Sequence, residues 1–250
     1  MQNAASVALM YDVFAKYYDR AEGDSPAGFA AWVIDKARQY GDEPRSLLEL
    51  GCGTGGVLAE LPKAWNKVGV DRSSAMLTVA RSKDLGARLI EDDITRLALD
   101  QRFDVVACVF DTINHIVDPT KWAATFAVAR SHLQPGGIFL WDMNTVGRLR
   151  TLAENTPVTF DVDDATLTMD VRPTQDAQYD WEINAEVAGE QPQREVIVEV
   201  AFPLDTVRAM VEDAGFDVLE VREIGGQDAS DESVRAYFVC RARDEAGARP

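Results

Sequence analysis

The feature that most constrains the fold is a short apolar run that passes directly into a glycine cluster and then into a helical pattern. It reads Leu47-Leu-Glu-Leu-Gly51-Cys-Gly53-Thr-Gly55-Gly56. Glycine permits tight turns and lets a ligand lie against the backbone, so this unit predicts a cofactor-binding loop. Gly51, Gly53 and Gly56 also fit the G-x-G-x-x-G dinucleotide fingerprint, and the loop alone therefore does not identify the cofactor.

From Ser46 onward, short apolar runs alternate with helical patterns. Continuously apolar strands separated by helices are typical of a parallel sheet that is covered on both faces and joined by right-handed crossovers. The expected strands are 46–50, 67–70, 87–91, 103–110 and 137–142, and the expected helices between them are 56–61, 74–82 and 120–133.

The segments on either side of this core have different patterns. Residues 1–45 carry apolar residues at three- and four-residue spacing, which predicts a helical N-terminal cap. Residues 157–202 mostly alternate apolar and polar residues, which is typical of antiparallel strands with one solvated face. We expect a single domain with the cap at 1–45, the core at 46–145 and 203–243, and the insert at 157–202 over the carboxyl edge of the sheet.

Three acidic positions help to distinguish the cofactors that a glycine loop can bind. Glu49 lies inside a strand, where a carboxylate is costly unless a partner such as a ligand ammonium group neutralises it. Asp71 ends the next strand, where it can accept from both ribose hydroxyls, as acids in NAD sites also do. Asp93 follows the third strand, where it can accept from an adenine amine while Ile94 packs on the ring. Each acid alone could be a solvated strand end, but together they suit a cationic sulfonium ligand better than a diphosphate.

Charge and cysteine content exclude several classes of protein. The chain has 25 Lys and Arg against 42 Asp and Glu, and its net charge of −17 argues against naked nucleic acid as a partner. Its three cysteines form no CxxC pair, which argues against a disulfide framework or zinc site and indicates a reducing cytoplasm. Apolar runs are strand-sized and no signal peptide is visible, so we expect no membrane partner, and we also expect no metal site.

Taken in order, the motifs resemble those of class I S-adenosylmethionine-dependent methyltransferases. Residues 48–55 are similar to their first motif, 70–77 to their second, and 92–94 to their adenine motif. Residues 103–110 and 133–139 resemble their fourth strand and the loop and strand that follow it. More specifically, Tyr18-Asp, residues 111–116 and residues 141–145 are similar to bacterial amino-sugar N,N-dimethyltransferases and to a group of uncharacterised small methyltransferases.

This resemblance implies a cofactor role for each matching residue. The three loop glycines would cradle the methionine part of S-adenosylmethionine, Glu49 would hold its amino group through water, and Asp71 would grip the ribose. Met76 would lie beside the adenine, which Asp93 and Ile94 would recognise. The full implied cofactor set is Tyr11, Tyr18, Glu49, Gly51, Cys52, Gly53, Gly55, Asp71, Arg72, Met76, Asp92, Asp93, Ile94 and Phe110.

Departures from the family pattern leave the acceptor open. Asp92 stands where a glycine is common, and Ile197 stands where the uncharacterised group often has a histidine. The fourth strand lacks the Asn/Asp-Pro-Pro-aromatic signature of enzymes that methylate adenine or glutamine. The identity of the acceptor is therefore not transferred by the resemblance.

For the part of the site that binds the methyl acceptor, the sequence offers only candidate residues. Of the two histidines, His132 lies in a helix and is expected to be structural, whereas His115 follows the fourth strand and could act as a base or be satisfied by a local backbone group. Tyr18 could close the site or simply pack. The expected catalytic residues are His115 and Tyr18, and the expected acceptor contacts are Asp111, Asn114, His115, Trp141 and Asn144, although Asp111 and Asn114 could equally be turn residues.

These observations predict a doubly wound, Rossmann-like seven-stranded α/β sheet with an antiparallel insert after its fifth strand. The predicted function is methyl transfer from S-adenosylmethionine to a nitrogen or oxygen of a small molecule. Two alternatives remain, an NAD-dependent oxidoreductase and a non-catalytic S-adenosylmethionine-binding module, and cleavage or cyclisation of the cofactor is also open. The insert could be a lid or the surface of a homodimer, because exposed antiparallel edges invite pairing.

Overall fold

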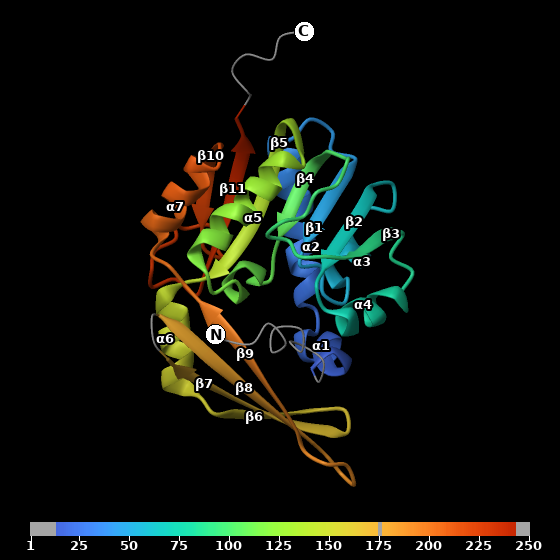
Figure 1. The fold of residues 1–250 in the computed structure, drawn as a ribbon, viewed down its shortest axis with the longest axis vertical. Coiled ribbons are helices and arrows are strands. Elements are labelled where there is room, and N and C mark those ends of the chain that lie inside the picture. The colour runs from blue at the N-terminus through green and yellow to red at the C-terminus, as the bar shows by residue number, and fades with distance from the viewer. Residues whose placement is uncertain (1–13, 175–176, 244–250) are drawn as a thin grey trace.

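The computed structural model describes residues 14–174 and 177–243. Its core is a sheet of seven strands in the order β3-β2-β1-β4-β5-β11-β10 (Figure 1). Their bounds are β1 (Ser46–Leu50), β2 (Asn66–Asp71), β3 (Ala87–Glu91), β4 (Phe103–Cys108), β5 (Leu133–Asn144), β10 (Phe216–Arg222) and β11 (Arg235–Ala242). β11 is antiparallel to both of its neighbours, and the other pairs are parallel. The predicted fold class is therefore confirmed.

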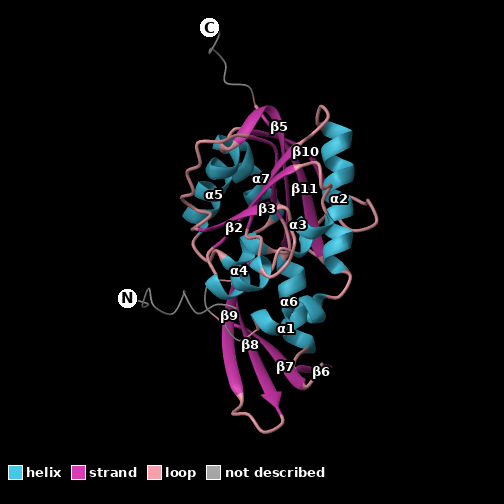
Figure 2. Cartoon of the chain, turned by 90° about the vertical axis from the view of Figure 1, so that its right-hand side faces the viewer, coloured by secondary structure: helices cyan, strands magenta, loops and turns pink. Residues whose placement is uncertain are grey.

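Helices cover both faces of this sheet, as Figure 2 shows. They are α1 (Ala15–Glu22), α2 (Ser25–Tyr40), α3 (Gly56–Glu60), α4 (Ser74–Arg81), the 3-10 helix η1 (Thr112–His115), α5 (Pro119–Ser131), α6 (Val146–Asn155) and α7 (Leu204–Asp213). Apolar residues of α2, α3 and α4 pack with one set of strand side chains, and those of α5 and α7 pack with the other set. Burial on both faces explains why the core strands are continuously apolar.

The insert forms a second sheet in the order β6-β7-β8-β9, and all of its pairs are antiparallel. Its strands are β6 (Val158–Val162), β7 (Ala165–Pro173), β8 (Gln178–Val187) and β9 (Gln193–Val200). Tyr17 of α1 packs against Val162 and Leu167 on one face of this sheet. The backbone N–H of Phe14 also donates to Glu195 at 3.2 Å. The N-terminal cap is thus fastened to the insert as well as to the core.

Helix α6 was not predicted from the sequence. Thr145 caps it by accepting a hydrogen bond from the Arg148 N–H at 3.1 Å, and Leu149 is fully buried. The segment VGRLRTLAEN offers too few apolar residues to form a recognisable stripe, so its position depends on tertiary contacts with β7.

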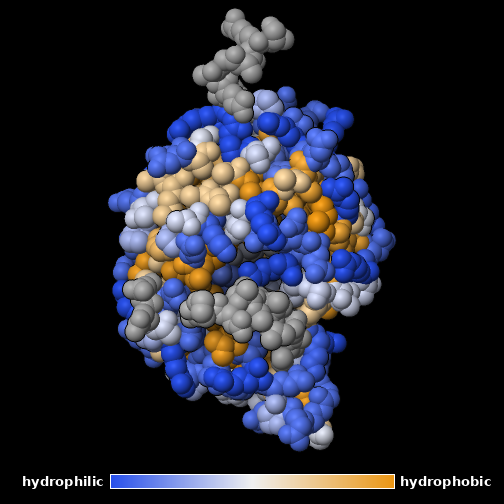
Figure 3. All heavy atoms as spheres, viewed as in Figure 1, coloured by the Kyte–Doolittle hydropathy of each residue, from blue (hydrophilic) through white to orange (hydrophobic). Residues whose placement is uncertain are grey.

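The surface of the molecule is mostly polar. The face shown in Figure 3 is largely hydrophilic, with smaller hydrophobic areas between the polar ones. Among the described residues, no helix has both the length and the apolar character needed to cross a membrane.

Candidate active site

The glycine loop lies at the carboxyl end of β1 and borders a cavity of about 230 Å³. Gly51 and Gly53 have φ values of +76° and +52°, which favour glycine. A Cβ atom on Gly51 would lie 2.2 Å from Cγ2 of Thr112, whereas one on Gly53 would have no neighbour within 4 Å. Gly51 therefore allows the close approach of the loop to η1, and Gly53 leaves its backbone open to a ligand.

The cavity runs from the glycine loop past the ends of β2 and β3 to η1. Of the residues expected to bind the cofactor or the acceptor, those that line it are Tyr18, Glu49, Gly51, Cys52, Gly53, Asp71, Arg72, Met76, Asp92, Asp93, Ile94, Phe110 and His115. Lining residues that the sequence did not single out include Thr95, Thr112 and Lys121. No local sequence pattern identifies these three residues as site residues, because only the tertiary structure brings them to the cavity.

Gly55 differs from the expectation. It does not line the cavity, and a Cβ atom there would lie 2.5 Å from Cδ1 of Leu85. Its φ of +76° lets the chain turn into α3 against that side chain. In this structure Gly55 packs the loop, and its predicted contact with the cofactor stays a prediction. Tyr11 lies outside the described residues.

Glu49 presents a buried carboxylate to the cavity. Its side chain is only 2% exposed, and its Oε2 atom has no hydrogen-bond partner among the described residues. Burial, and to a smaller extent the charge of Asp71, raises the pKa of Glu49 to about 8. A cationic ligand group beside Oε2 would stabilise the ionised form of this carboxyl, whereas a diphosphate would gain no positive partner from it.

Asp71 connects the glycine loop to β2. Its Oδ2 accepts from the Gly53 N–H at 2.8 Å, and its Oδ1 accepts from the Ser73 N–H at 2.8 Å. Burial raises the pKa of Asp71, although these backbone hydrogen bonds oppose the change. Each oxygen keeps a lone pair, so the carboxylate can hold the loop and still accept from two ribose hydroxyls.

The far end of the cavity is formed by residues after β3. Oδ1 of Asp93 accepts from both the backbone N–H and the hydroxyl of Thr95, at 2.9 and 2.8 Å. Burial alone would raise the pKa of Asp93, but these hydrogen bonds make the net change a decrease. Asp93 is therefore an ionised acceptor beside the apolar side chains of Ile94 and Met76, which suits an adenine ring with an exocyclic amine.

Helix α1 closes the cavity near the loop. Asp19 accepts from the Thr54 hydroxyl at 2.5 Å and pairs with Lys83 at 2.6 Å. These contacts hold α1 over the glycine loop and bring Tyr18 to the cavity wall. Burial raises the pKa of Tyr18 well above its usual value, so the phenol stays protonated. Asp19 belongs to the Tyr18-Asp pair noted in the sequence, but its contacts could not be predicted because its partners come from distant segments.

The chain turns sharply at the end of β4, where the sequence predicted that the strand would continue. Phe110 and Asp111 both have left-handed backbones, with φ of +61° and +48°. Two consecutive non-glycine residues in this region are strained, and such strain is concentrated at functional sites. The turn places Phe110, Thr112 and His115 on the cavity wall.

His115 lies between the cavity and a buried polar cluster. Its imidazole, the Asp111 carboxylate and the Glu199 carboxylate have ligand-type atoms that all lie within 4.8 Å of one another. Burial lowers the pKa of His115, and the Asp111 charge only partly offsets this effect. The imidazole is therefore neutral near pH 7 and can accept a proton.

Arg235 neutralises the acids behind His115. Its guanidinium pairs with Asp111 at 2.8 Å and also with Asp142, which is fully buried. Oxygen and nitrogen atoms in this arrangement could also coordinate a metal ion, but the guanidinium already takes the cation position beside Asp111. The ion pair between Arg235 and Asp142 could not be predicted from sequence patterns, because β5 and β11 are far apart in the chain.

Asn114 and Asn144 do not line the cavity but join the core to the insert. The Asn114 amide donates to the carbonyl oxygens of Asn144 and Val200 at 3.0 and 2.8 Å. Asn144 donates to Asp111 at 3.1 Å and to Glu199 at 3.0 Å. Both asparagines are buried, so these contacts correct the prediction that they bind the acceptor directly. Asp111 likewise lies behind the cavity wall.

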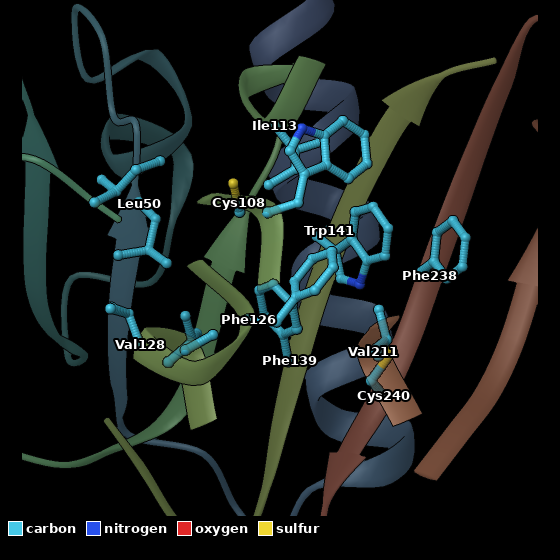
Figure 4. Packing of buried hydrophobic residues seen from close by; sticks show 14 of the residues in the cluster. Leu50, Cys108, Ile113, Phe126, Val128, Phe139, Trp141, Val211, Phe238 and Cys240 are labelled. Carbon is cyan, nitrogen blue, oxygen red and sulfur yellow. The ribbon is translucent and has the colours of Figure 1, made fainter. Parts of the chain in front are cut away.

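Trp141 is a core residue, which corrects a further prediction of acceptor contact. It is fully buried, and its ring stacks on Phe238 with centroids 4.0 Å apart (Figure 4). Alternation along β5 places Trp141 on the same face as Phe139, under α5, whereas Asp142 points to the other face. His132 is structural as expected, because it is buried and its Nε2 accepts from the Leu99 N–H at 2.8 Å.

Replacement of Glu49 by glutamine is expected to change cofactor affinity and protein stability in opposite directions at pH 8. Because the folded-state pKa is raised, the stability associated with Glu49 is present below pH 4.5 and is lost as the pH rises towards 8. Glu49→Gln should therefore raise the melting temperature at pH 8 relative to wild type, with little change at pH 4.5. The same variant should bind S-adenosylmethionine about 10- to 100-fold more weakly, since one charge-assisted contact is lost. Thermal unfolding and calorimetry at both pH values check this, and wild-type affinity in the variant would contradict it.

Comparison with known proteins agrees with this site. A methyltransferase-domain family model matches residues 47–137. The dTDP-3-amino-3,4,6-trideoxy-alpha-D-glucopyranose N,N-dimethyltransferase of Streptomyces venezuelae is 32% identical over 132 residues, which are 52% of this chain and 54% of that protein. The dTDP-3-amino-3,6-dideoxy-alpha-D-glucopyranose N,N-dimethyltransferase of Streptomyces fradiae is 29% identical over 136 residues, 54% of this chain and 52% of that protein. The matched region thus spans about half the length of these curated relatives.

The similarity to a solved structure is more extensive. An S-adenosylmethionine-dependent methyltransferase from Clostridium acetobutylicum superimposes with a TM-score of 0.82 at 25% identity, covering 93% of this chain and 99% of that one. The ordered motifs, the acidic cavity beside an open glycine loop and these matches agree with one another. Residues 47–137 thus match a methyltransferase domain, and the fold as a whole is similar to that of S-adenosylmethionine-dependent methyltransferases.

Proposed function

We propose that this protein transfers a methyl group from S-adenosylmethionine to a nitrogen of a small molecule. The observation that carries the proposal is a single cavity whose wall holds Glu49, Asp71 and Asp93 along one part and His115 at another. The curated relatives named above, which act on amino sugars, support nitrogen as the acceptor atom.

The residues of the cavity fit the cofactor chemically. The unpartnered Oε2 of Glu49 suits an ammonium group, the Asp71 carboxylate suits ribose hydroxyls, and the open Gly53 backbone admits a ligand. Bound S-adenosylmethionine would supply an electrophilic methyl group on a sulfonium centre. An NAD-dependent oxidoreductase is disfavoured, because a diphosphate at this loop would face Glu49.

His115 and Tyr18 are proposed to serve the acceptor. An alkylamine is mostly protonated near neutral pH and must lose a proton before its lone pair can attack. The neutral imidazole of His115 can take that proton at the cavity wall, consistent with its lowered pKa. Tyr18 keeps its phenol proton and can donate a hydrogen bond to orient the acceptor. Positioning by such groups accounts for several orders of magnitude in rate for bimolecular transfers.

The proposal extends to the setting of the reaction. The net charge of −17 supports a small-molecule acceptor in place of naked nucleic acid, and three free, buried cysteines support a reducing cytoplasm. The core, cap and insert are proposed to act as one domain, with the insert as the lid. Exposed Val158 and Phe160 on β6 support pairing of two copies through this strand.

Mass spectrometry of reactions with a panel of acceptors tests the proposed function. Each amine, including sugar nucleotides with an amino group, is paired with its hydroxyl counterpart. We expect mass increases of one or two methyl groups on amines only, together with S-adenosylhomocysteine. Methylation of the hydroxyl partners alone would overturn nitrogen as the acceptor atom. Cofactor binding without turnover across the panel would favour the non-catalytic alternative.

A further inference from the structure

A buried carboxyl pair lies behind His115, and one member comes from the insert. Glu199 of β9 is 2% exposed, and its Oε2 accepts from the Asn144 amide nitrogen at 3.0 Å. The same nitrogen donates to Asp111 at 3.1 Å. An oxygen of Glu199 and an oxygen of Asp111 also lie within 4.8 Å of each other. One asparagine therefore holds two carboxyl groups side by side in the protein interior.

Two adjacent and largely buried carboxyl groups cannot both be ionised at low cost. The Arg235 guanidinium, 2.8 Å from Asp111, stabilises the negative charge on Asp111. Burial and the Asp111 charge both raise the pKa of Glu199 well above its usual value. Electrostatics thus assigns the charge to Asp111 and the proton to Glu199.

The wider surroundings do not reverse this assignment. Arg235 already pairs with two carboxylates, Asp111 and Asp142. Among the described residues, the other titratable or charged groups whose fields reach the pair or His115 are Glu22 and Tyr18 of α1, Arg72 beyond β2, Arg148 of α6 and Tyr237 of β11. Glu199 itself accepts from Asn144 and lies beside Asp111.

We infer that Glu199 is a positioning residue that stays protonated, donates a hydrogen bond to the Asp111 carboxylate, and so holds one fixed negative charge behind His115. In the proposed function, on which this inference rests, the acceptor's proton moves to the imidazole, and the Asp111 charge stabilises the imidazolium that forms. Because Glu199 belongs to β9, the insert supplies part of this arrangement as well as covering the site.

Nuclear magnetic resonance titration of His115 tests the inference without acceptor or cofactor. The chain has only two histidines, and the spectrum of a His115→Gln variant assigns the signals. Glutamine has the shape and donor group of a protonated glutamate, so Glu199→Gln should leave the pKa of His115 unchanged. Asp111→Asn removes the charge itself and should lower the pKa of His115 by about 1 unit or more.

The matched control is Glu195→Gln, a buried carboxyl on the same strand that lies roughly 13 Å along it from Glu199. It should not move the His115 titration. If Glu199 is ionised in the wild type, Glu199→Gln will lower the pKa of His115 much as Asp111→Asn does, and the inference is overturned. A change in the wild-type titration on adding a chelator would also overturn it, because the cluster would then hold a metal ion and not a proton.

Stability provides a second readout. The pKa of Glu199 is higher in the folded protein than in the unfolded chain, so the free energy of unfolding decreases as the pH rises above the unfolded-state pKa. Glu199→Gln lacks this titrating group and should therefore lose less stability than wild type between pH 5 and pH 8. An identical loss in both proteins would contradict the inference. Neither measurement involves methyl transfer, so failure of the proposed function and failure of this inference remain distinguishable.

Discussion

Replacing Asp71 with alanine is expected to weaken S-adenosylmethionine binding by about 100- to 10,000-fold while the protein stays folded. Two hydrogen bonds from ribose hydroxyls to a charged acceptor would be lost, each of which contributes roughly 1.5–3 kcal/mol. The substitution also frees the Gly53 N–H, which Asp71 holds at 2.8 Å, so the glycine loop becomes less preorganised. Isothermal titration calorimetry measures the affinity, and circular dichroism confirms folding.

The control for this experiment is Asp217→Ala. Asp217 is an exposed acid on β10 that pairs with Arg243 at 2.7 Å, remote from the cavity. Its removal changes the net charge by the same amount and should leave affinity unchanged. Wild-type affinity in Asp71→Ala would show that the cofactor lies elsewhere.

The second large effect is expected at His115. His115→Gln should lower kcat about 100-fold or more with an amine acceptor, because a positioned base contributes at least this much to proton transfer. Affinity for S-adenosylmethionine should change little, since the cofactor residues are untouched. Steady-state kinetics and calorimetry on the same preparation separate the two effects.

The role of His115 as a base also predicts how kcat/KM changes with pH. A base must be unprotonated, so wild-type kcat/KM should fall as the pH drops through the pKa of His115, which burial places below the usual histidine value. His115→Gln should lack this acid limb. His132→Gln, which alters the buried structural histidine, should retain the limb even if it lowers stability. An unchanged limb in His115→Gln would remove His115 from the mechanism.

The parallel core could be predicted because its strands are buried on both faces. The bounds of β1 and β3 agree with the predicted runs, and β2 differs by one residue at each end. The glycine loop and the acids at the strand ends are local in sequence, so their placement around one cavity follows from topology alone. These elements carry the cofactor half of the site.

The part of the site that is proposed to serve the methyl acceptor depends on contacts between distant segments, which no local sequence pattern predicts. Asp142 and Trp141 are neighbours in sequence, yet one reaches Arg235 while the other lies in the core. Glu199 meets Asp111 only because the insert folds back over η1, and it was not singled out from the sequence. Helix α6 and the Asp19–Thr54 contact likewise form through packing between distant segments.

Calorimetric titration of the wild-type protein with S-adenosylhomocysteine and, separately, with NADH distinguishes the two cofactors that a glycine loop of this kind can bind. We expect one binding site for S-adenosylhomocysteine, with affinity lost in Asp71→Ala, and no heat of binding for NADH. Saturable binding of NADH with none for S-adenosylhomocysteine would contradict it, because the acids along the cavity would then not select a sulfur-containing nucleoside.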